Sequence, residues 1–541
     1  MVPGNHLEPE AGCPDLHLWC PASRSAPEVR PVSNQVNRRL LHMEVVHTAP
    51  KRTSGDSVRE IPVSLIRRCF TGRNLALALT LLTALLAPWA AVYPHGLSGD
   101  IWWLLTVGHY DLAHHTILSR NYYSYTSPRE SWVDVEWGWQ VFAAWLQGVF
   151  GVRAIWLLSA GIIDLVALAV AYRLHKRGAS SQKALILALW CTLAVVGTYD
   201  RARAVVLSFL IFTALLWILD QAKSKNGRWL FALPPLFALW ANVHGSYLLG
   251  LTVLDIEVVL AKWGGRLEAH IGSGRLTIPR LRLRSAILAL IGALIGVCVN
   301  PWGLQNPLVS VRLATNPQIA TFIEEWQSPN FHNYALLFIV GLPILVTVIS
   351  LIHSDHPVRA DDLILVGLLL AATLVSVRML PYYIIAWAGL ASAHPLPELK
   401  PRLWVLAAAV WVAAASVGIL VTPPIESMTA ESSMPVTLMT AASATGGRIF
   451  TTYRTEDWAV SKHIPVFIDG RADLYVTGHP SIFMQFIDTA SGVDPGKTLN
   501  RWDIKNVVFH RVSALSSWLS NAPNWRLMKT EGGWVWYERK P

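Results

Sequence analysis

Three carboxylates between residues 95 and 136 have the type and spacing that catalysis requires. Asp100 follows a short turn, precedes an amphipathic segment and has no basic neighbour in the sequence. A carboxylate in such a position can take the proton of an attacking hydroxyl group as a general base. Asp134 and Glu136 alternate along an extended segment and could therefore face one way. All three are catalytic candidates, and the pair could bind a divalent cation, although two carboxylates alone do not establish a metal site.

A second set of polar residues lies farther along the chain and is suited to binding a substrate. It combines arginines, an amide, an imidazole and a carboxylate pair, namely Arg201, Arg203, Arg378, Asn242, His244, Glu324 and Glu325. Arginines bind phosphate groups strongly, so the three arginines are candidates for holding an anionic substrate. Each arginine could instead only reach the surface along its apolar stem or pair with a carboxylate. His244 is equally well explained as a structural hydrogen-bonding residue.

The composition excludes a soluble enzyme as the scaffold for these residues. Hydrophobic residues make up 53% of the 541 residues, and charged residues make up only 15%. A soluble protein of this size carries about a quarter of its residues as charges. The apolar content also excludes a chain that is disordered throughout. The sequence therefore predicts an α-helical polytopic membrane protein.

Apolar runs of about 17–25 residues indicate the membrane-spanning helices. Eleven candidates, several of them short, lie at 74–94, 152–172, 183–199, 204–220, 229–243, 245–261, 285–299, 333–352, 361–377, 381–394 and 402–422. The 229–261 stretch could instead form one long helix and a re-entrant piece, so the count carries an error of about one or two.

Lys and Arg residues in the connections predict the orientation of these helices. With the N-terminus inside, the inner connections carry about 20 Lys and Arg residues and the outer connections about six. The net charge of +10 is then mainly a signal for orientation, and nucleic-acid binding loses its support. In this topology the N-terminus is cytoplasmic, and the candidate residues collect at the outer ends of the helices. Their convergence from distant segments is the strongest functional signal in the sequence.

Two segments flank the predicted transmembrane domain of residues 74–422. Residues 1–73 form a basic cytoplasmic segment, predicted to be disordered over residues 1–60, and Met43 could be the true start. Residues 423–541 contain strand-like runs at 448–453, 466–469, 506–509 and 534–537, with an amphipathic stretch at 514–519. This alternation predicts a small extracytoplasmic α/β domain. Its candidate residues are Asp469, Arg471 and Asp473, although Asp469 and Arg471 could simply stabilise each other in a turn.

At these residues the sequence resembles the GT-C superfamily of membrane glycosyltransferases, and more closely a set of bacterial membrane proteins described as GT-C-like. The similarity to that set runs from about residue 74 to the C-terminus. The segments that carry it are Gly99–Trp103, Trp132–Trp137, Leu239–Gly245, Asn300–Gly303, Glu325-Trp326, Arg378–Pro381 and Phe467–Asp473.

The resemblance implies a reaction and roles for individual residues. In the superfamily, a sugar moves from a polyprenyl-phosphate-linked donor to an acceptor at the outer membrane face. For this chain we expect the transfer to invert the configuration at the anomeric carbon. Asp100 matches the first-loop Asp that acts as general base, and Arg201, Arg203 and Arg378 would neutralise the departing lipid phosphate. The oligosaccharyltransferase pattern Trp-Trp-Asp-Tyr-Gly is absent, with Tyr453–Trp458 as the corresponding stretch, so sequon glycosylation is not implied. The bacterial plasma membrane is also implied by the resemblance alone.

Two other classes of protein remain open. A transporter would place ionisable groups near the membrane midplane, often on broken helices in related halves. Here the charges lie at one face and no internal repeat is evident, which favours the enzyme. A non-catalytic partner in envelope assembly could keep the same scaffold and dock through its outer domain, because a fold does not fix an activity. The sugar, the acceptor and the oligomeric state stay open.

Overall fold

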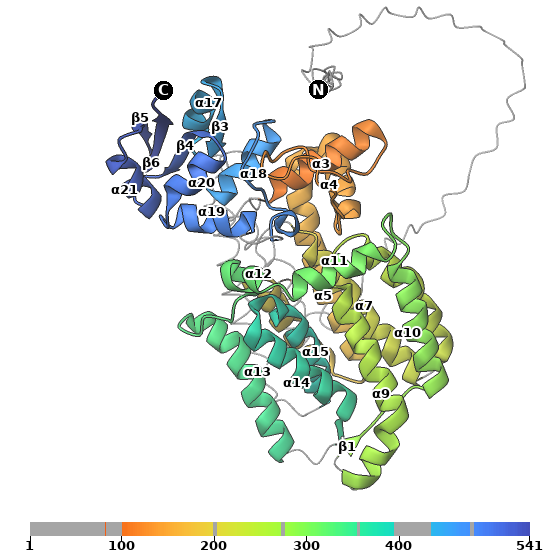
Figure 1. Cartoon of the computed structure of the whole chain (residues 1–541). Coiled ribbons are helices and arrows are strands. Elements are labelled where there is room, and N and C mark those ends of the chain that lie inside the picture. Colours follow the sequence, from red (N-terminus) through yellow and green to blue (C-terminus); the bar gives the residue numbers. More distant parts are fainter. Residues whose placement is uncertain are drawn as a thin grey trace, which may run out of the picture. The chain divides into compact units, whose positions relative to one another are not determined.

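The structure is a computed structural model that describes residue 82 and residues 100–198, 203–224, 226–271, 276–353, 357–393, 434–476 and 481–541. The predicted N-terminal segment, the predicted spans at 74–94 (apart from residue 82) and 402–422, and Arg201 lie outside these residues. The described chain consists of a helical part and a small C-terminal part that contains a mixed sheet (Figure 1).

Long apolar helices build the helical part. Within the described ranges, four helices are long and apolar enough to cross a membrane: α5 (Val152–Lys176), α6 (Ser181–Thr198), α7 (Val205–Ser224) and α13 (Tyr334–His353). Further helices cover the other predicted spans of this region: α8 (Leu233–Ala241), α9 (Tyr247–Ile271), α10 (Leu283–Val297), α14 (Ala360–Val375) and α15 (Leu380–Ser392). Several of these are shorter than a bilayer requires, so the predicted count of eleven is not confirmed.

Shorter helices connect the long ones. They are α3 (Ile101–His114), α4 (Trp137–Phe150), η1 (Gly227–Ala232), α11 (Gln305–Ala314), α12 (Pro317–Phe322), η2 (Glu324–Trp326) and η3 (Val377–Met379). Two short strands, β1 (Leu276–Thr277) and β2 (Val358–Arg359), pair in parallel. The helix α4 was not predicted. The 229–261 stretch is broken between α8 and α9, which corresponds to two predicted segments rather than one long helix.

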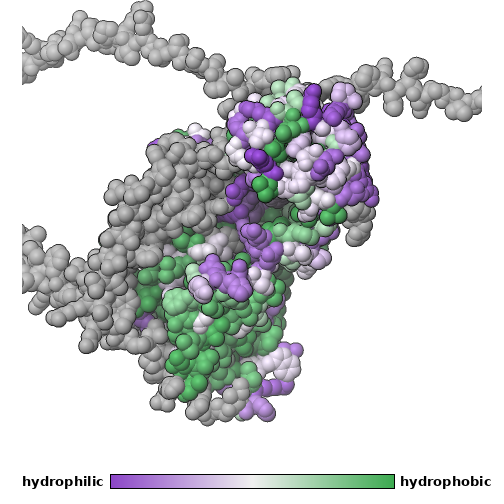
Figure 2. Space-filling model, turned by 90° about the vertical axis from the view of Figure 1, so that its left-hand side faces the viewer, coloured by the Kyte–Doolittle hydropathy of each residue, from purple (hydrophilic) through white to green (hydrophobic). Residues whose placement is uncertain are grey.

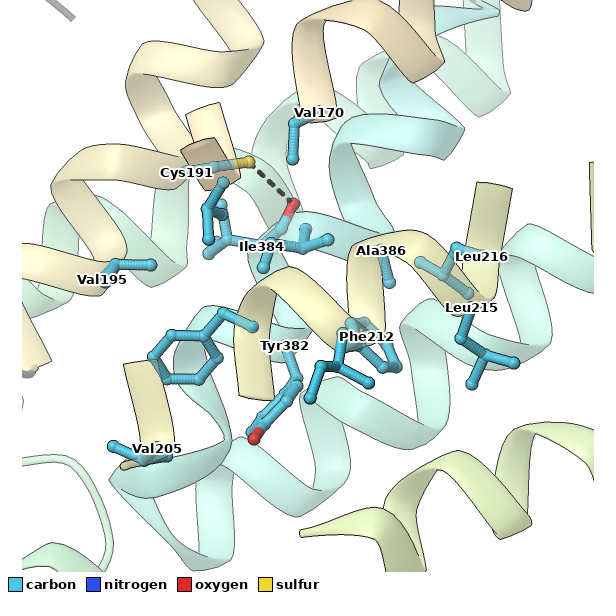
Figure 3. Close-up of a cluster of buried hydrophobic side chains, with 14 of the residues drawn as sticks. Val170, Cys191, Val195, Val205, Phe212, Leu215, Leu216, Tyr382, Ile384 and Ala386 are labelled. Atoms are coloured by element: carbon cyan, nitrogen blue, oxygen red, sulfur yellow. Dashed lines mark hydrogen bonds between the residues drawn. The ribbon is translucent and has the colours of Figure 1, made fainter. Parts of the chain in front are cut away.

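Helix α15 lies in the apolar core of the helical part. Figure 3 shows side chains of α5, α6 and α7 packed around it, with the Cys191 thiol 3.7 Å from the carbonyl oxygen of Ile384. The rings of Phe212 and Tyr382 meet edge to face, with centroids 5.2 Å apart. All side chains of α15 from Leu380 to Ala391 are buried. This packing fixes the chain that directly precedes α15, which carries Arg378.

A network of ion pairs ties α5, α7, α9 and α14 together. It contains four cations and four carboxylates, namely Arg173, Arg177, Lys223, Arg359, Asp220, Glu257, Asp361 and Asp362. Lys223, for example, lies 2.5 Å from Glu257 and 2.7 Å from Asp361. Mutual pairing offsets the cost of burying these charges. The network occupies the ends of α7 and α14 opposite to Arg203 and Arg378.

The surface of the helical part is suited to a bilayer. Figure 2 shows a broad hydrophobic surface there, bounded by hydrophilic residues at both of its ends. On α10 and α13, Leu288, Ile295, Phe338, Leu345 and Ile352 are each more than half exposed. Contiguous exposed apolar surface of this kind marks contact with a membrane or partner. The chain is an integral membrane protein.

The C-terminal part contains a four-stranded mixed sheet in the order β3-β4-β6-β5. Its strands are β3 (Arg448–Phe450), β4 (Ile504–His510), β5 (Trp525–Glu531) and β6 (Trp534–Arg539). Its helices are α17 (Val436–Ala444), α18 (Tyr453–Ser461), η6 (Ala472–Leu474), α19 (Ile482–Ala490), α20 (Pro495–Arg501) and α21 (Ala514–Asn521). Three of the four predicted strands are present, whereas the 466–469 run forms only an isolated bridge between Val466 and Ser124. The edge strand β5 was not predicted. Only Trp525 among its residues is buried, so its sequence lacks the alternation of a half-buried strand.

The first connecting segment shares a hydrophobic core with the C-terminal part. Trp103, Leu118 and Trp132 belong to the same buried cluster as the sheet residues. The hydroxyl of Tyr125 donates to the carbonyl oxygen of Ile449 at 2.7 Å. Helix α18 packs against α3. The position of α3, and with it Asp100, therefore depends on the C-terminal part as well as on the long helices.

Candidate active site

Arg203 joins two carboxylates that are far apart in the sequence. Its Nη2 atom lies 2.8 Å from Oδ2 of Asp100, and its Nη1 atom donates to Oε1 of Glu325. Asp100 directly precedes α3, Arg203 precedes α7, and Glu325 lies in η2. Between 25% and 31% of each side chain is exposed, so a substrate can reach this bridge.

Arg378 is held by an imidazole and an aromatic ring. Its Nη2 atom lies 2.8 Å from Nε2 of His244, and its guanidinium lies 5.0 Å from the centre of the Trp326 ring. Because an arginine only donates, Nε2 of His244 accepts, while Nδ1 lies 2.8 Å from Oγ of Ser246 and 3.2 Å from the backbone nitrogen of the same residue. Burial and the charges of Arg378 and Arg203 lower the pKa of His244 well below its usual value. His244 is therefore neutral and orients Arg378.

The positive charges of Arg378 and Arg203 both act on the carboxyl group of Glu136. Its Oε1 atom is 3.4 Å from the imidazole of His244. Burial raises the pKa of Glu136 to about 7, against the opposing effect of Arg378, while the neighbouring carboxylate of Asp100 adds to the rise. This carboxyl group therefore changes its charge near neutral pH, next to the groups that would meet a substrate.

The loops that carry these side chains are fastened to each other. Oγ of Ser376 donates to the carbonyl oxygen of Glu325 at 3.1 Å, and the N–H of Val377 donates to that of Gln327 at 2.8 Å. These bonds join η2 to η3. The backbone segments that carry Glu325 and Arg378 are therefore joined to one another.

Asn242 belongs to the framework of the site. Its side-chain N–H groups donate to Ala238 and Val299, both at 2.7 Å, and its Oδ1 accepts from Nε1 of Trp137 at 2.7 Å. Its carbonyl oxygen accepts from the N–H of Gly138, where a Cβ atom would lie only 2.5 Å from that oxygen. Glycine at this position therefore allows α4 to begin directly beside the turn that carries His244.

Asp134 does not form a pair with Glu136. Its Oδ1 atom accepts the backbone N–H of Glu136 and a side-chain N–H of Gln140, both at 2.9 Å. The residue is only 1% exposed, and burial raises its pKa well above the usual value. The chain turns at residues 135–136 instead of staying extended, so the two carboxyl groups point to different surroundings. Glu324, the neighbour of Glu325, is exposed.

Asp469 and Arg471 stabilise each other and attach the C-terminal part to the first connecting segment. Both side chains are fully buried, and Nη2 of Arg471 lies 2.6 Å from Oδ2 of Asp469 and from Oδ1 of Asn121. The guanidinium stacks on the rings of Trp132 and Tyr123, at 4.9 and 5.2 Å. The structure thus agrees with the structural alternative for this pair.

Asp473 and Gly470 lie on the same segment. Burial raises the pKa of Asp473 to about 7, although the charge of Arg471 opposes this rise. Gly470 packs so closely on α3 that a Cβ atom would lie 2.1 Å from Nε1 of Trp103. The 467–475 segment is therefore seated directly against the helix that begins after Asp100.

Asp457 is a candidate that the sequence did not single out. It lies on α18, is 1% exposed, and its Oδ1 accepts the N–H of Gly470 at 2.7 Å. Burial raises its pKa well above the usual value, with a further contribution from the charge of Asp100. The available signal was an acidic residue beside Trp458 in an otherwise amphipathic helix.

No protein-family model and no curated protein sequence matches the chain. Among solved structures, the chain is similar to the archaeal oligosaccharyltransferase AglB from Archaeoglobus fulgidus in complex with an inhibitory peptide and a dolichol-phosphate. The TM-score is 0.51 at 10% identity, and the match covers 86% of this chain and 74% of that one. The apo form of the Archaeoglobus fulgidus oligosaccharyltransferase gives a TM-score of 0.49 at 10% identity, with 84% and 72% covered. In its fold, the chain is therefore similar to a GT-C membrane glycosyltransferase, as its sequence resemblance predicted.

Proposed function

We propose that this protein is a membrane glycosyltransferase that uses a polyprenyl-phosphate-linked sugar as donor. The observation that carries this proposal is the ion pair of a partly exposed carboxylate, Asp100, with Arg203, in a site where Asp100, Arg203 and Arg378 all act electrostatically on Glu136. A base for the acceptor and cations for the leaving phosphate are what such a transfer needs.

The transfer is a single displacement with inversion. The acceptor hydroxyl oxygen attacks the anomeric carbon of the sugar while the bond from that carbon to the phosphate oxygen breaks. The electron pair of the broken bond leaves with the lipid phosphate, and the hydroxyl proton passes to Asp100. The ion pair with Arg203 orients the Asp100 carboxylate.

The leaving phosphate needs fixed positive charge. Arg378 is the first candidate, because His244 and the Trp326 ring hold its guanidinium in place. Arg203 adds a second guanidinium, and Arg201 is a further candidate from the sequence. Preorganised cations in a partly buried site lower the energy of a departing anion more than they would in water.

The structural comparison supports a lipid-phosphate donor. The archaeal structure with the higher TM-score holds a dolichol-phosphate, which is itself a polyprenol-type lipid phosphate.

The setting that fits this reaction is the outer face of a bacterial plasma membrane. The opposite end, which holds the buried network of Arg173, Arg177, Lys223 and Arg359, would be cytoplasmic, because the predicted inner connections are rich in Lys and Arg. The site and the C-terminal part would then be extracytoplasmic, and the N-terminus cytoplasmic.

Binding of polyprenyl phosphate to the purified protein tests the role of Arg378. We expect Arg378→Gln to weaken binding by about tenfold or more, since a charge-assisted hydrogen bond contributes about 1.5–3 kcal/mol. Arg153→Gln removes the same charge at an exposed position at the start of α5 and is the matched control. Equal binding by Arg378→Gln and the wild type would remove the phosphate-binding role.

A further inference from the structure

Two carboxylates of the site converge on one position, as the ligands of a cation do. Asp100 and Glu325 come from different segments and turn toward the same point, where one cation contacts both. Converging carboxylate oxygens are the ligands that Mg²⁺, Mn²⁺ and Ca²⁺ prefer. A divalent cation would therefore be expected between them if the space were open to one.

The guanidinium of Arg203 fills that position. One of its terminal nitrogens contacts Asp100 at 2.8 Å, and the other donates to Glu325. A guanidinium is always charged, and its planar fork suits two carboxylates at once. A metal ion that bound both carboxylates would have to displace the side chain.

The remaining carboxylates do not complete another metal site. Glu136 faces His244, whose Nε2 atom already accepts from Arg378. Asp134 is turned into the protein, with one oxygen bonded to a backbone N–H and to Gln140. Throughout the residues that the structure describes, no group of three or more His, Cys, Asp or Glu side chains is arranged to hold a metal ion.

We propose that Arg203 is the built-in cation of this site and takes the place that a divalent metal would occupy between Asp100 and Glu325. The site then works without added metal. This inference rests on the proposed function for its catalytic meaning, but the placement of the cation can be tested without any sugar or lipid donor.

The charge balance is consistent with a permanent monovalent cation. Arg203 and Arg378 supply two positive charges against the carboxylates of Asp100 and Glu325. Glu136 adds a third negative charge only when it is ionised. A site that is close to neutral before binding can accept a phosphate anion at a smaller electrostatic cost than one with excess negative charge.

Binding of Mn²⁺ to the full chain in a non-ionic detergent tests this proposal, with free Mn²⁺ measured by electron paramagnetic resonance. We expect no saturable binding by the wild type up to about 1 mM Mn²⁺, the weak end of protein cation sites. Arg203→Gln should create one saturable Mn²⁺ site, with a Kd of about 0.1 mM or less. Addition of Asp100→Asn to Arg203→Gln should abolish the new site.

Two further variants keep the test decisive. Arg153→Gln removes a positive charge elsewhere and should bind no Mn²⁺. Arg203→Lys is the second variant if Arg203→Gln cannot be purified; its ammonium group reaches one carboxylate at a time, so Mn²⁺ binding should also appear, but more weakly.

Two results would overturn the proposal. One is Mn²⁺ binding by the wild type that Asp100→Asn removes, because the carboxylates would then hold a metal despite Arg203. The other is no binding by any Arg203 variant that folds, because the carboxylates would then have no affinity for a cation in this position. A failure of glycosyl transfer would change neither result, so the two proposals fail separately.

Discussion

At the scale of single residues, Glu136 controls the net charge of the site. Below its pKa of about 7 it is neutral, and Arg203 and Arg378 then face the carboxylates of Asp100 and Glu325. Above that pKa its negative charge is added beside Arg378. Since the donor is itself an anion, ionisation of Glu136 should weaken donor binding.

Glu136→Gln tests this effect. The variant carries no ionisable group at this position, so it should bind polyprenyl phosphate as the neutral wild type does. At about pH 6 the two proteins should bind alike, and at about pH 8 the wild type should bind about tenfold more weakly than the variant. The ionisation of the phosphate itself is common to both proteins and cancels in the comparison. A pH-independent ratio of the two affinities would contradict the assigned role.

Residue type at helix ends singled out several residues that lie close together in the structure. Charges in a membrane protein are costly, so Asp100, Arg203 and Arg378 were conspicuous in an apolar sequence. Their partners could not be predicted, because the residues of each pair lie more than 100 positions apart in the sequence. Asp457 was not chosen as a candidate although it lies within the Tyr453–Trp458 stretch, because one more carboxylate in a polar segment carries no distinctive signal.

At the scale of elements, the seating of the 467–475 segment on α3 positions Asp100. The contact depends on Gly470, since any side chain there would run into the indole of Trp103. Arg471 adds its stacked and hydrogen-bonded contacts to the same junction.

Gly470→Ala should loosen this junction. Overpacking of this kind costs about 1–3 kcal/mol, and we expect a lower melting temperature together with a loss of donor binding. Gly161→Ala on α5 is the control, because a Cβ atom there meets nothing within 4 Å. Thermal unfolding followed by Trp fluorescence measures the stability of both variants. A Gly470→Ala protein as stable and as tight in binding as the wild type would show that the contact does not position the site.

The pattern of apolar residues predicted the presence of helices and strands better than it predicted where they end or which elements they pair with. The long apolar runs became α5, α6, α7 and α13, because length and composition alone define a spanning helix. The 466–469 run became a buried connection instead of a strand, because tertiary bonds to Tyr123 and Tyr125 replace those of a sheet. Edge strand β5 carries polar side chains on both faces and therefore shows no alternation.

At the scale of the whole molecule, the proposed orientation places the site outside and the buried ion-pair network inside. Val512 in the C-terminal part is 95% exposed, and Ser180 lies exposed between α5 and α6. In a protein without its native cysteines, Val512→Cys should react with an impermeant thiol reagent in intact cells. Ser180→Cys should react only after the membrane is permeabilised. The reverse pattern would invert the topology and place the site in the cytoplasm.

The central claim is that the protein binds a polyprenyl-phosphate-linked sugar and that Asp100 is needed to transfer it. Mass spectrometry of lipids that co-purify with the wild type and with Asp100→Asn tests this claim most directly. Loss of a general base slows such a step by about 10²–10⁴-fold, so the variant should retain the sugar-linked lipid. The wild type should hold less of that lipid and more of the sugar-free polyprenyl phosphate. Absence of both lipids from both proteins would contradict the account and favour a non-catalytic membrane protein.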